Sequence, residues 1–143
     1  LPVWPVGDER GSPDEDAVSG EVYGLLDELA DRRDAKVENL SGGQAKMVSI
    51  GRALALQPDL LILDEPLEGL APVIVERLKA HIQRINEQGI AVLIAESNVQ
   101  HVPEIVDQLY VIERGEIFAS GDPVTVSDRT EVQELMQGSG QDP

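Results

Sequence analysis

The sequence predicts an α/β fold with a parallel sheet at its core, and three consecutive segments carry this prediction. Leu60 to Leu63 is a continuous apolar run without alternation, which is typical of a strand buried on both faces of a parallel sheet. Pro72 suits the first position of a helix, and Ile90 to Ala95 forms a second apolar strand. A strand-helix-strand unit of this kind is normally right-handed, with its two strands parallel.

The composition is that of a single aliphatic domain. The chain has 143 residues, of which 41% are hydrophobic and only 3% aromatic, so the core must consist of Leu, Ile, Val and Ala. There are no cysteines, which excludes disulfides and thiolate chemistry. No apolar run approaches the roughly 20 residues that cross a bilayer, so we expect any membrane link to run through a partner.

The charge is strongly acidic, with 27 Asp and Glu against 11 Lys and Arg and a formal net charge of -16. Such a surface repels phosphate backbones, so we expect no nucleic-acid partner. Two interpretations of the acidity stay open. It is either a plain acidic surface or an adaptation to molar salt, where the screening length falls to about 3 Å.

Three helical segments are expected before and between the strands. Residues 1–18 are expected to form a poorly ordered acidic entry loop, and an amphipathic helix is predicted from Ser19 to about Arg33. A second helix follows Ser41 and stops at Gln57-Pro58, and a third runs from Pro72 to Gly89. Their predicted buried stripes are Val22, Leu25, Leu26 and Leu29; Met47, Ile50 and Leu54; and Val75, Leu78, Ile82 and Ile85.

The last third of the chain predicts four short elements. A short helix is expected around Val99 to Val106, and a hairpin is expected from Leu109 to Ile112 and Glu116 to Ala119. The last helix is predicted from Thr130 to Gln137, before a disordered tail at 138–143.

Ser41-Gly42-Gly43 is a candidate anion site because it opens a helix. The first amides of a helix lack intrahelical partners and carry the positive end of the dipole, and glycines let an anion approach them closely. The Ser41 hydroxyl adds another donor. Taken alone, the segment is better explained as an ordinary Ser N-cap after a glycine turn.

Asp64-Glu65 is a candidate metal and water site because it ends a buried strand, where open α/β sheets place ligands. One carboxylate can hold Mg²⁺ with its waters, while its neighbour orients or deprotonates another water for in-line attack. Taken alone, it is equally a strand with acidic residues at the following turn.

Together the two motifs resemble the ATP-binding cassette ATPases. Leu40 to Gln44 is similar to the signature motif of that family, and Leu60 to Pro66 is similar to its Walker B motif with the catalytic Glu. Gly69 to Pro72 and Glu96 to Val99 look most like the ATPase subunits of branched-chain amino acid importers. The resemblance implies a P-loop NTPase-type three-layer sandwich with a helical signature subdomain on its N-terminal side.

The resemblance also implies the roles of single residues. Asp64 would bind Mg²⁺ through water, Glu65 would activate the attacking water, and Ser97 would stand where many relatives have a γ-phosphate-binding His. The expected contacts to the γ-phosphate of ATP on a second ATPase subunit are Ser41, Gly42, Gly43 and Gln44. His101 is an alternative to Ser97, whereas His81 is expected on a polar helix face without a role.

The implied partners are a second ATPase subunit, which makes a homo- or heterodimer, and transmembrane permease subunits. The chain would then lie in the cytoplasm, on the inner face of the membrane.

The sequence contains no G-x-x-x-x-G-K-[ST] phosphate-binding loop, so we expect it to correspond to the C-terminal half of such a domain. In this division, residues 19–59 belong to the helical signature subdomain and residues 60–137 to the α/β core. An alternative is a non-catalytic interaction fragment or relic that cannot bind ATP by itself. We expect an exposed apolar sheet edge and self-association of the isolated chain in either case.

Overall fold

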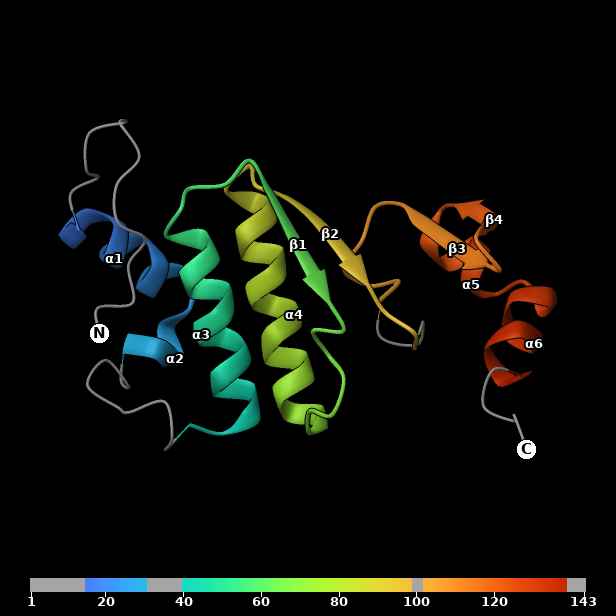
Figure 1. Cartoon of the computed structure of the whole chain (residues 1–143), viewed down its shortest axis with the longest axis horizontal. Helices are drawn as coiled ribbons and strands as arrows, with labels where there is room; N and C mark the ends of the chain where they lie inside the picture. Colours follow the sequence, from blue (N-terminus) through green and yellow to red (C-terminus); the bar gives the residue numbers. More distant parts are fainter. Residues whose placement is uncertain (1–14, 31–39, 99–101, 139–143) are drawn as a thin grey trace. The chain divides into compact units, whose positions relative to one another are not determined.

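The computed structural model describes residues 15–30, 40–98 and 102–138 (Figure 1). It divides into two compact units, Leu1–Ile94 and Ala95–Pro143. The expected boundary between residues 59 and 60 therefore falls inside the first unit. The predicted entry loop up to residue 14 and the predicted tail from 139 lie outside the described residues.

A parallel pair of strands and two long helices form the centre of the first unit. Strands β1 (Leu60–Asp64) and β2 (Ala91–Ala95) are hydrogen-bonded neighbours that point the same way (Figure 1). Helix α3 (Gly42–Leu54) precedes β1, and helix α4 (Pro72–Glu87) joins the two strands, as the strand-helix-strand pattern predicts. Pro72 stands at the start of α4, where its missing amide proton costs no hydrogen bond.

The core of this unit confirms the predicted stripes of α3 and α4. The helices bury one face each, and β1 contributes two further side chains. The buried residues are Met47, Ile50, Leu54, Leu61, Leu63, Val75, Leu78, Ile82 and Ile85.

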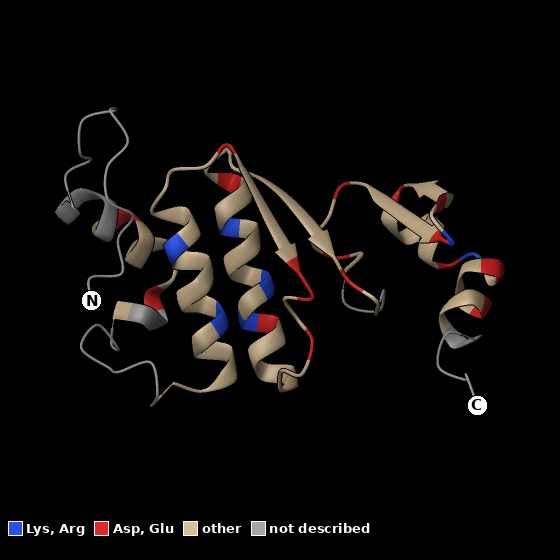
Figure 2. Cartoon of the chain, viewed as in Figure 1, with Lys and Arg blue, Asp and Glu red and all other residues tan. Residues whose placement is uncertain are grey.

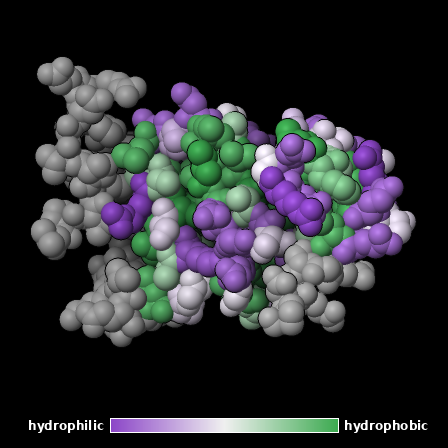
Figure 3. Space-filling view, turned by 45° about the vertical axis from the view of Figure 1, so that its right-hand side comes forward, coloured by the Kyte–Doolittle hydropathy of each residue, from purple (hydrophilic) through white to green (hydrophobic). Residues whose placement is uncertain are grey.

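The other face of the strand pair is exposed, so the prediction that Leu60 to Leu63 is buried on both faces is wrong for this chain. Burial alternates along β1, and Leu60 and Ile62 are exposed. Leu93 of β2 is exposed as well. The physical reason is that the described residues of the first unit place no second layer against this face. Figure 3 shows hydrophobic areas on the molecular surface.

The N-terminal helices differ in their bounds from the single helix expected from Ser19 to Arg33. Helix α1 (Glu15–Leu25) begins four residues earlier than expected. The helical conformation is interrupted at Leu26, and the short helix α2 (Asp27–Ala30) follows. Leu26 is fully buried at this break, and Val22 is buried too. Residues 31–39 lie outside the described part.

His81 is buried, so its expected place on a polar helix face is wrong. Its Nδ1 lies 2.9 Å from the carbonyl oxygen of Leu25 in α1, and its Nε2 lies 3.9 Å from Oδ1 of Asp27. Arg84 lies 3.8 Å from the other oxygen of the Asp27 carboxylate. His81 and Arg84 therefore link α4 to α1 and α2 through polar groups.

The second unit is a hairpin with two helices. Strands β3 (Leu109–Glu113) and β4 (Glu116–Gly121) are antiparallel, as predicted, and are joined through Arg114 and Gly115. Both turn residues have positive φ, at 50° and 84°, which is the conformation of a type I′ hairpin turn. Helix α6 (Thr130–Gly138) confirms the last predicted helix. Val111, Ala119, Val126 and Val132 form the core.

Two segments of this unit differ from the expectation. Residues 102–105 form a turn with a hydrogen bond from Ile105 N to Val102 O, where a short helix is expected. Helix α5 (Pro123–Ser127) was not expected, although Asp122 caps it through the Thr125 amide at 2.8 Å. Within the described residues, no helix is both long enough and apolar enough to span a bilayer.

Candidate functional site

The first turn of α3 is closed by a reciprocal cap. Ser41 Oγ accepts a hydrogen bond from the Gln44 amide at 3.3 Å, and Gln44 Oε1 accepts one from the Ser41 amide at 3.0 Å. This is the capping box, in which two of the unpaired amides of a helix start are satisfied. The cap does not use the amides of Gly42 and Gly43, which lie in the same turn.

The two glycines of this turn lie in different surroundings. Gly42 is exposed, and a Cβ placed on it would meet nothing within 4 Å. Gly43 is buried, and its Cβ would lie only 2.6 Å from Cγ2 of Ile74 in α4. Gly42 therefore leaves the helix start open to a ligand, whereas Gly43 allows α3 and α4 to meet.

The end of β1 places two carboxylates in unlike environments. Asp64 is the last residue of the strand and is exposed. Glu65 follows with a φ of 46°, in the left-handed region that non-glycine residues rarely adopt, and its Oε2 is shielded from solvent. Backbone strain of this kind concentrates at functional sites, where the surrounding structure enforces it.

Lys46 connects helix α3, which begins at the capped turn, with the segment that follows β1. Its Nζ donates to the carbonyl oxygen of Glu65 at 2.7 Å and to that of Glu68 at 2.8 Å. Figure 2 shows the acidic residues along the segment after β1 and the basic residues on α3 and α4. Lys46 is a site residue that sequence patterns do not predict, because the two carbonyls that it contacts lie 19 and 22 residues away.

Comparison with known proteins identifies the family and the fold. The sequence profile of the ABC transporter family matches residues 13–68. The crystal structure of an ATP-binding cassette of an ABC transporter in its ADP conformation is 32% identical and superposes with a TM-score of 0.76, covering 91% of this chain and 54% of that one. The chain belongs to the ATP-binding cassette family. The P-loop NTPase-type fold expected from the sequence is thereby confirmed.

Relatives of this ATP-binding cassette chain include proteins named for amino acid transport and proteins named for lipopolysaccharide export. A high-affinity branched-chain amino acid transport ATP-binding protein of Pseudomonas aeruginosa is 38% identical, covering 67% of this chain and 41% of the relative. A lipopolysaccharide export system ATP-binding protein of Acidithiobacillus ferridurans is 35% identical, and the match covers 96% of this chain and 54% of the relative. The chain thus spans about half the length of the relatives it matches.

Two places in this chain have the chemistry to bind parts of Mg-ATP: the start of α3 for phosphate oxygens and Asp64 for Mg²⁺. Open amides at a helix start are a site for phosphate oxygens, and Gly42 leaves that approach clear. Among the described residues, no group of three or more His, Cys, Asp or Glu side chains could hold a metal ion. Mg²⁺ does not need such a cage in phosphoryl transfer, because one or two carboxylates, waters and the substrate phosphates complete its shell. Asp64 fits this mode.

The remaining expected site residues are Gln44, Ser97 and, as an alternative to Ser97, His101. The side chain of Gln44 faces back into the cap, where it bonds to the Ser41 amide. Ser97 follows β2 with an exposed side chain and belongs to the second unit. Its role at the γ-phosphate stays a prediction, and His101 lies outside the described residues.

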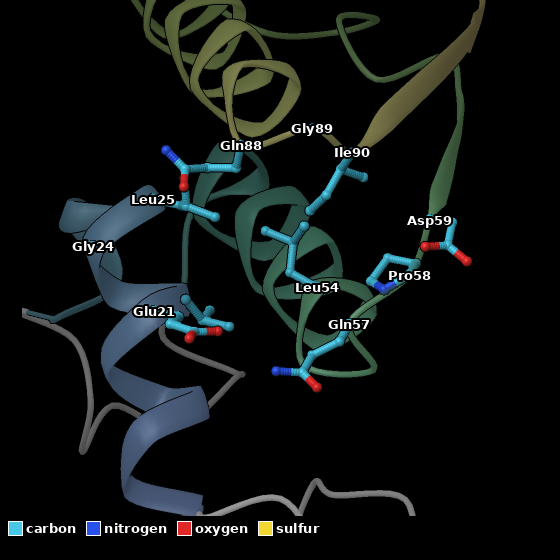
Figure 4. Close-up of a pocket in the computed structure, with 11 residues that line it drawn as sticks. Glu21, Gly24, Leu25, Leu54, Gln57, Pro58, Asp59, Gln88, Gly89 and Ile90 are labelled. Atoms are coloured by element: carbon cyan, nitrogen blue, oxygen red, sulfur yellow. The ribbon is translucent and has the colours of Figure 1, made fainter.

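A cavity of about 590 Å³ lies at the opposite end of α3 and α4 from the capped turn. Figure 4 shows five of the lining residues: Glu21 and Leu25 of α1, Leu54 at the end of α3, Gln57 after α3 and Gln88 after α4. The residues that line the cavity do not include Asp64 or Glu65, so the cavity is separate from them.

Proposed function

We propose that this chain supplies two functional parts of an ATP-hydrolysing dimer. The capped turn from Ser41 to Gln44 contacts the γ-phosphate of ATP held on a second subunit, and Asp64 and Glu65 serve the ATP on their own subunit. The observation that supports this most is the pairing of an open, capped helix start with a strand-end Glu in a left-handed conformation. Lys46 joins them.

Each residue has a distinct task in this proposal. The amides of Gly42 and Gly43 donate to phosphate oxygens, and the Ser41 hydroxyl adds a further donor. Asp64 would hold Mg²⁺ through water, and when bound the ion would supply positive charge beside the phosphates. Glu65 accepts a hydrogen bond from the attacking water and aligns it, while Ser97 donates to the γ-phosphate from the segment after β2.

The transport function we propose is uptake of branched-chain or similar amino acids. The Pseudomonas relative and a branched-chain amino acid transport relative of Methanocaldococcus jannaschii, 36% identical, support this choice. A second candidate is lipopolysaccharide export, which the relative matched over 96% of the chain supports. In either case the chain acts in the cytoplasm, on the inner face of the membrane, through permease subunits.

The hydrolysis step is tested in the natural polypeptide that carries these residues, with its permease subunits present. Glu65→Gln is expected to lower kcat by about 10²–10⁴-fold, the usual share of a general base. Glu87→Gln, an exposed change of the same kind at the end of α4, serves as the control. A Glu65→Gln variant with normal kcat would exclude the proposed role.

A complementation experiment tests the sharing of sites across the dimer. Gly42→Asp places a carboxylate where a phosphate oxygen would lie, and a Cβ at this position meets nothing within 4 Å. Gly42→Asp and Glu65→Gln are each expected to be inactive. Mixed dimers of the two regain activity only if the turn of one subunit serves the Glu65 of the other, because one of the two sites is then intact.

Uptake assays separate the two transport candidates. Cells that depend on this protein are expected to lose uptake of radiolabelled leucine when Glu65→Gln replaces the wild type. Normal leucine uptake together with loss of lipopolysaccharide from the outer surface would favour export instead.

The non-catalytic alternative predicts that these 143 residues alone bind a partner but do not turn over ATP. The Lys and backbone contacts of a phosphate-binding loop are central to nucleotide binding in P-loop enzymes, and this sequence contains no such loop. We therefore expect the 143-residue chain alone to be inactive. Mg-ATP hydrolysis by it, abolished by Glu65→Gln, would contradict this expectation.

A further inference from the structure

Lys46 is half-buried on the second turn of α3, and its ammonium group bonds to two backbone carbonyls of the turn that carries Glu65. These contacts span 19 and 22 residues of sequence. Hydrogen bonds in which the donor is charged are shorter and roughly twice as strong as neutral ones. The ammonium therefore fixes the 65–68 turn against α3.

The contact acts on Glu65 through its backbone. The carbonyl oxygen of Glu65 also accepts a bond from the Glu68 amide at 3.4 Å, so the orientation of this peptide is held from two sides. With φ at 46°, Glu65 lies outside the regions that an L-residue prefers, and a conformation of this kind persists only where neighbours enforce it. The backbone angles of a residue set the direction of its side chain.

We propose that Lys46 is a positioning residue, which holds Glu65 in the left-handed conformation that aims its carboxylate at the attacking water. The inference rests on the proposed function of Glu65. It adds that α3 serves two sites of the dimer, because its first turn contacts the nucleotide of the partner and its second turn orients the Glu of its own subunit.

The first test measures backbone hydrogen exchange and does not depend on activity. In Lys46→Met, which keeps the aliphatic stem, the Glu68 amide is expected to exchange at least about tenfold faster, as the loss of a charge-assisted bond implies. Lys46→Arg is expected to restore most of the protection because it keeps a donor. Arg129→Met, an exposed loss of one positive charge in the second unit, is the control. Unchanged exchange in Lys46→Met would overturn the inference.

The second test measures hydrolysis in the natural polypeptide, well below the melting temperature of each variant. Lys46→Met is expected to lower kcat by about 10–100-fold with little change in KM for ATP, the effect of misplacing a catalytic group. Lys46→Arg is expected to recover part of the rate. A lowered melting temperature with normal kcat would show a merely structural contact and overturn the inference.

The two tests also separate this inference from the proposed function. An inactive wild type with accelerated exchange in Lys46→Met would refute the ATPase proposal while leaving the backbone contact in place. An active wild type in which Glu65→Gln is inactive and Lys46→Met is fully active would refute the positioning role alone.

Discussion

Gly43 lies so close to Ile74 that a Cβ on the glycine would be 2.6 Å from Cγ2 of that side chain. The atom that would be struck is attached directly to the branched Cβ of Ile74, so it has little freedom to move aside. Gly43→Ala is therefore expected to destabilise the chain by about 1–3 kcal/mol, the usual cost of overpacking. Denaturant unfolding measures this difference.

Gly42→Ala is the matched control for that prediction. It adds the same methyl group one residue earlier on the same helix, where nothing lies within 4 Å. We expect it to leave stability unchanged or slightly raised, because Ala favours helix over Gly by about 1 kcal/mol. Adding Ile74→Ala to Gly43→Ala should remove the clash. If Gly42→Ala and Gly43→Ala lowered the free energy of unfolding equally, the packing role of Gly43 would be contradicted.

Asp122 is expected to make the second unit sensitive to acid. The backbone amide and the hydroxyl of Thr125 donate to its carboxylate and lower its pKa below the usual value of 3.8. A carboxyl group with a lowered folded-state pKa stabilises the fold above its unfolded pKa, and this stabilisation is lost as pH falls through the folded pKa. The melting temperature should therefore lose the contribution of this cap only below pH 3.8.

Asp122→Ser separates the cap from its charge. Serine is a good N-cap residue that does not titrate, so this variant should keep α5 and lose the part of the acid dependence that comes from Asp122. Asp122→Ala should lose both the N-cap of α5 and the acid dependence that comes from Asp122. If all three proteins show the same melting profile between pH 2 and pH 5, the cap contributes nothing measurable.

His81 is expected to be needed for stability because it satisfies a carbonyl of another helix. Its Nδ1 donates to Leu25 O at 2.9 Å in a buried place. His81→Leu leaves that acceptor unpaired and should cost about 1–3 kcal/mol. Glu87→Leu, an exposed change on the same helix, should stay within about 0.5 kcal/mol. An equally stable His81→Leu protein would show that water or another donor replaces the imidazole.

The exposed face of β1 and β2 is expected to drive association of the isolated chain. Ile62 and Leu93 are 64% and 55% exposed there, and large exposed apolar patches associate. Ile62→Thr combined with Leu93→Thr should reduce the particle size in light scattering at moderate salt. Val124→Thr, at an apolar position of α5 that is 58% exposed, is the control. A monodisperse wild-type monomer would contradict the expectation.

Local patterns predicted the long elements well. The stripes of α3 and α4 repeat with the period of a helix, so Met47, Ile50, Leu78 and Ile82 could be assigned to the core from sequence alone. The ordinary N-cap at Ser41, which was the alternative to an anion site, is present in the structure. The cap of α5 was also readable, because Asp122 directly precedes a proline at the helix start.

Non-local contacts explain the failures. Whether Ile62 is buried depends on what covers the second face of the sheet, and an apolar run does not reveal that. The burial of His81 comes from Leu25 and Asp27, more than 50 residues earlier. The role of Lys46 depends on carbonyls about 20 residues later, which no spacing rule connects to it.

The reciprocal cap of Ser41 and Gln44 also bears on the thermodynamics of recognition. Immobilising a flexible side chain at an interface costs about 0.5–1.5 kcal/mol, which is subtracted from the affinity. Here the Gln44 side chain is already bonded to the turn in the free chain. Folding has therefore already ordered the side chains around Gly42 before an anion binds there. Because binding does not have to order them again, less of the contact energy is lost and the dissociation constant is lower.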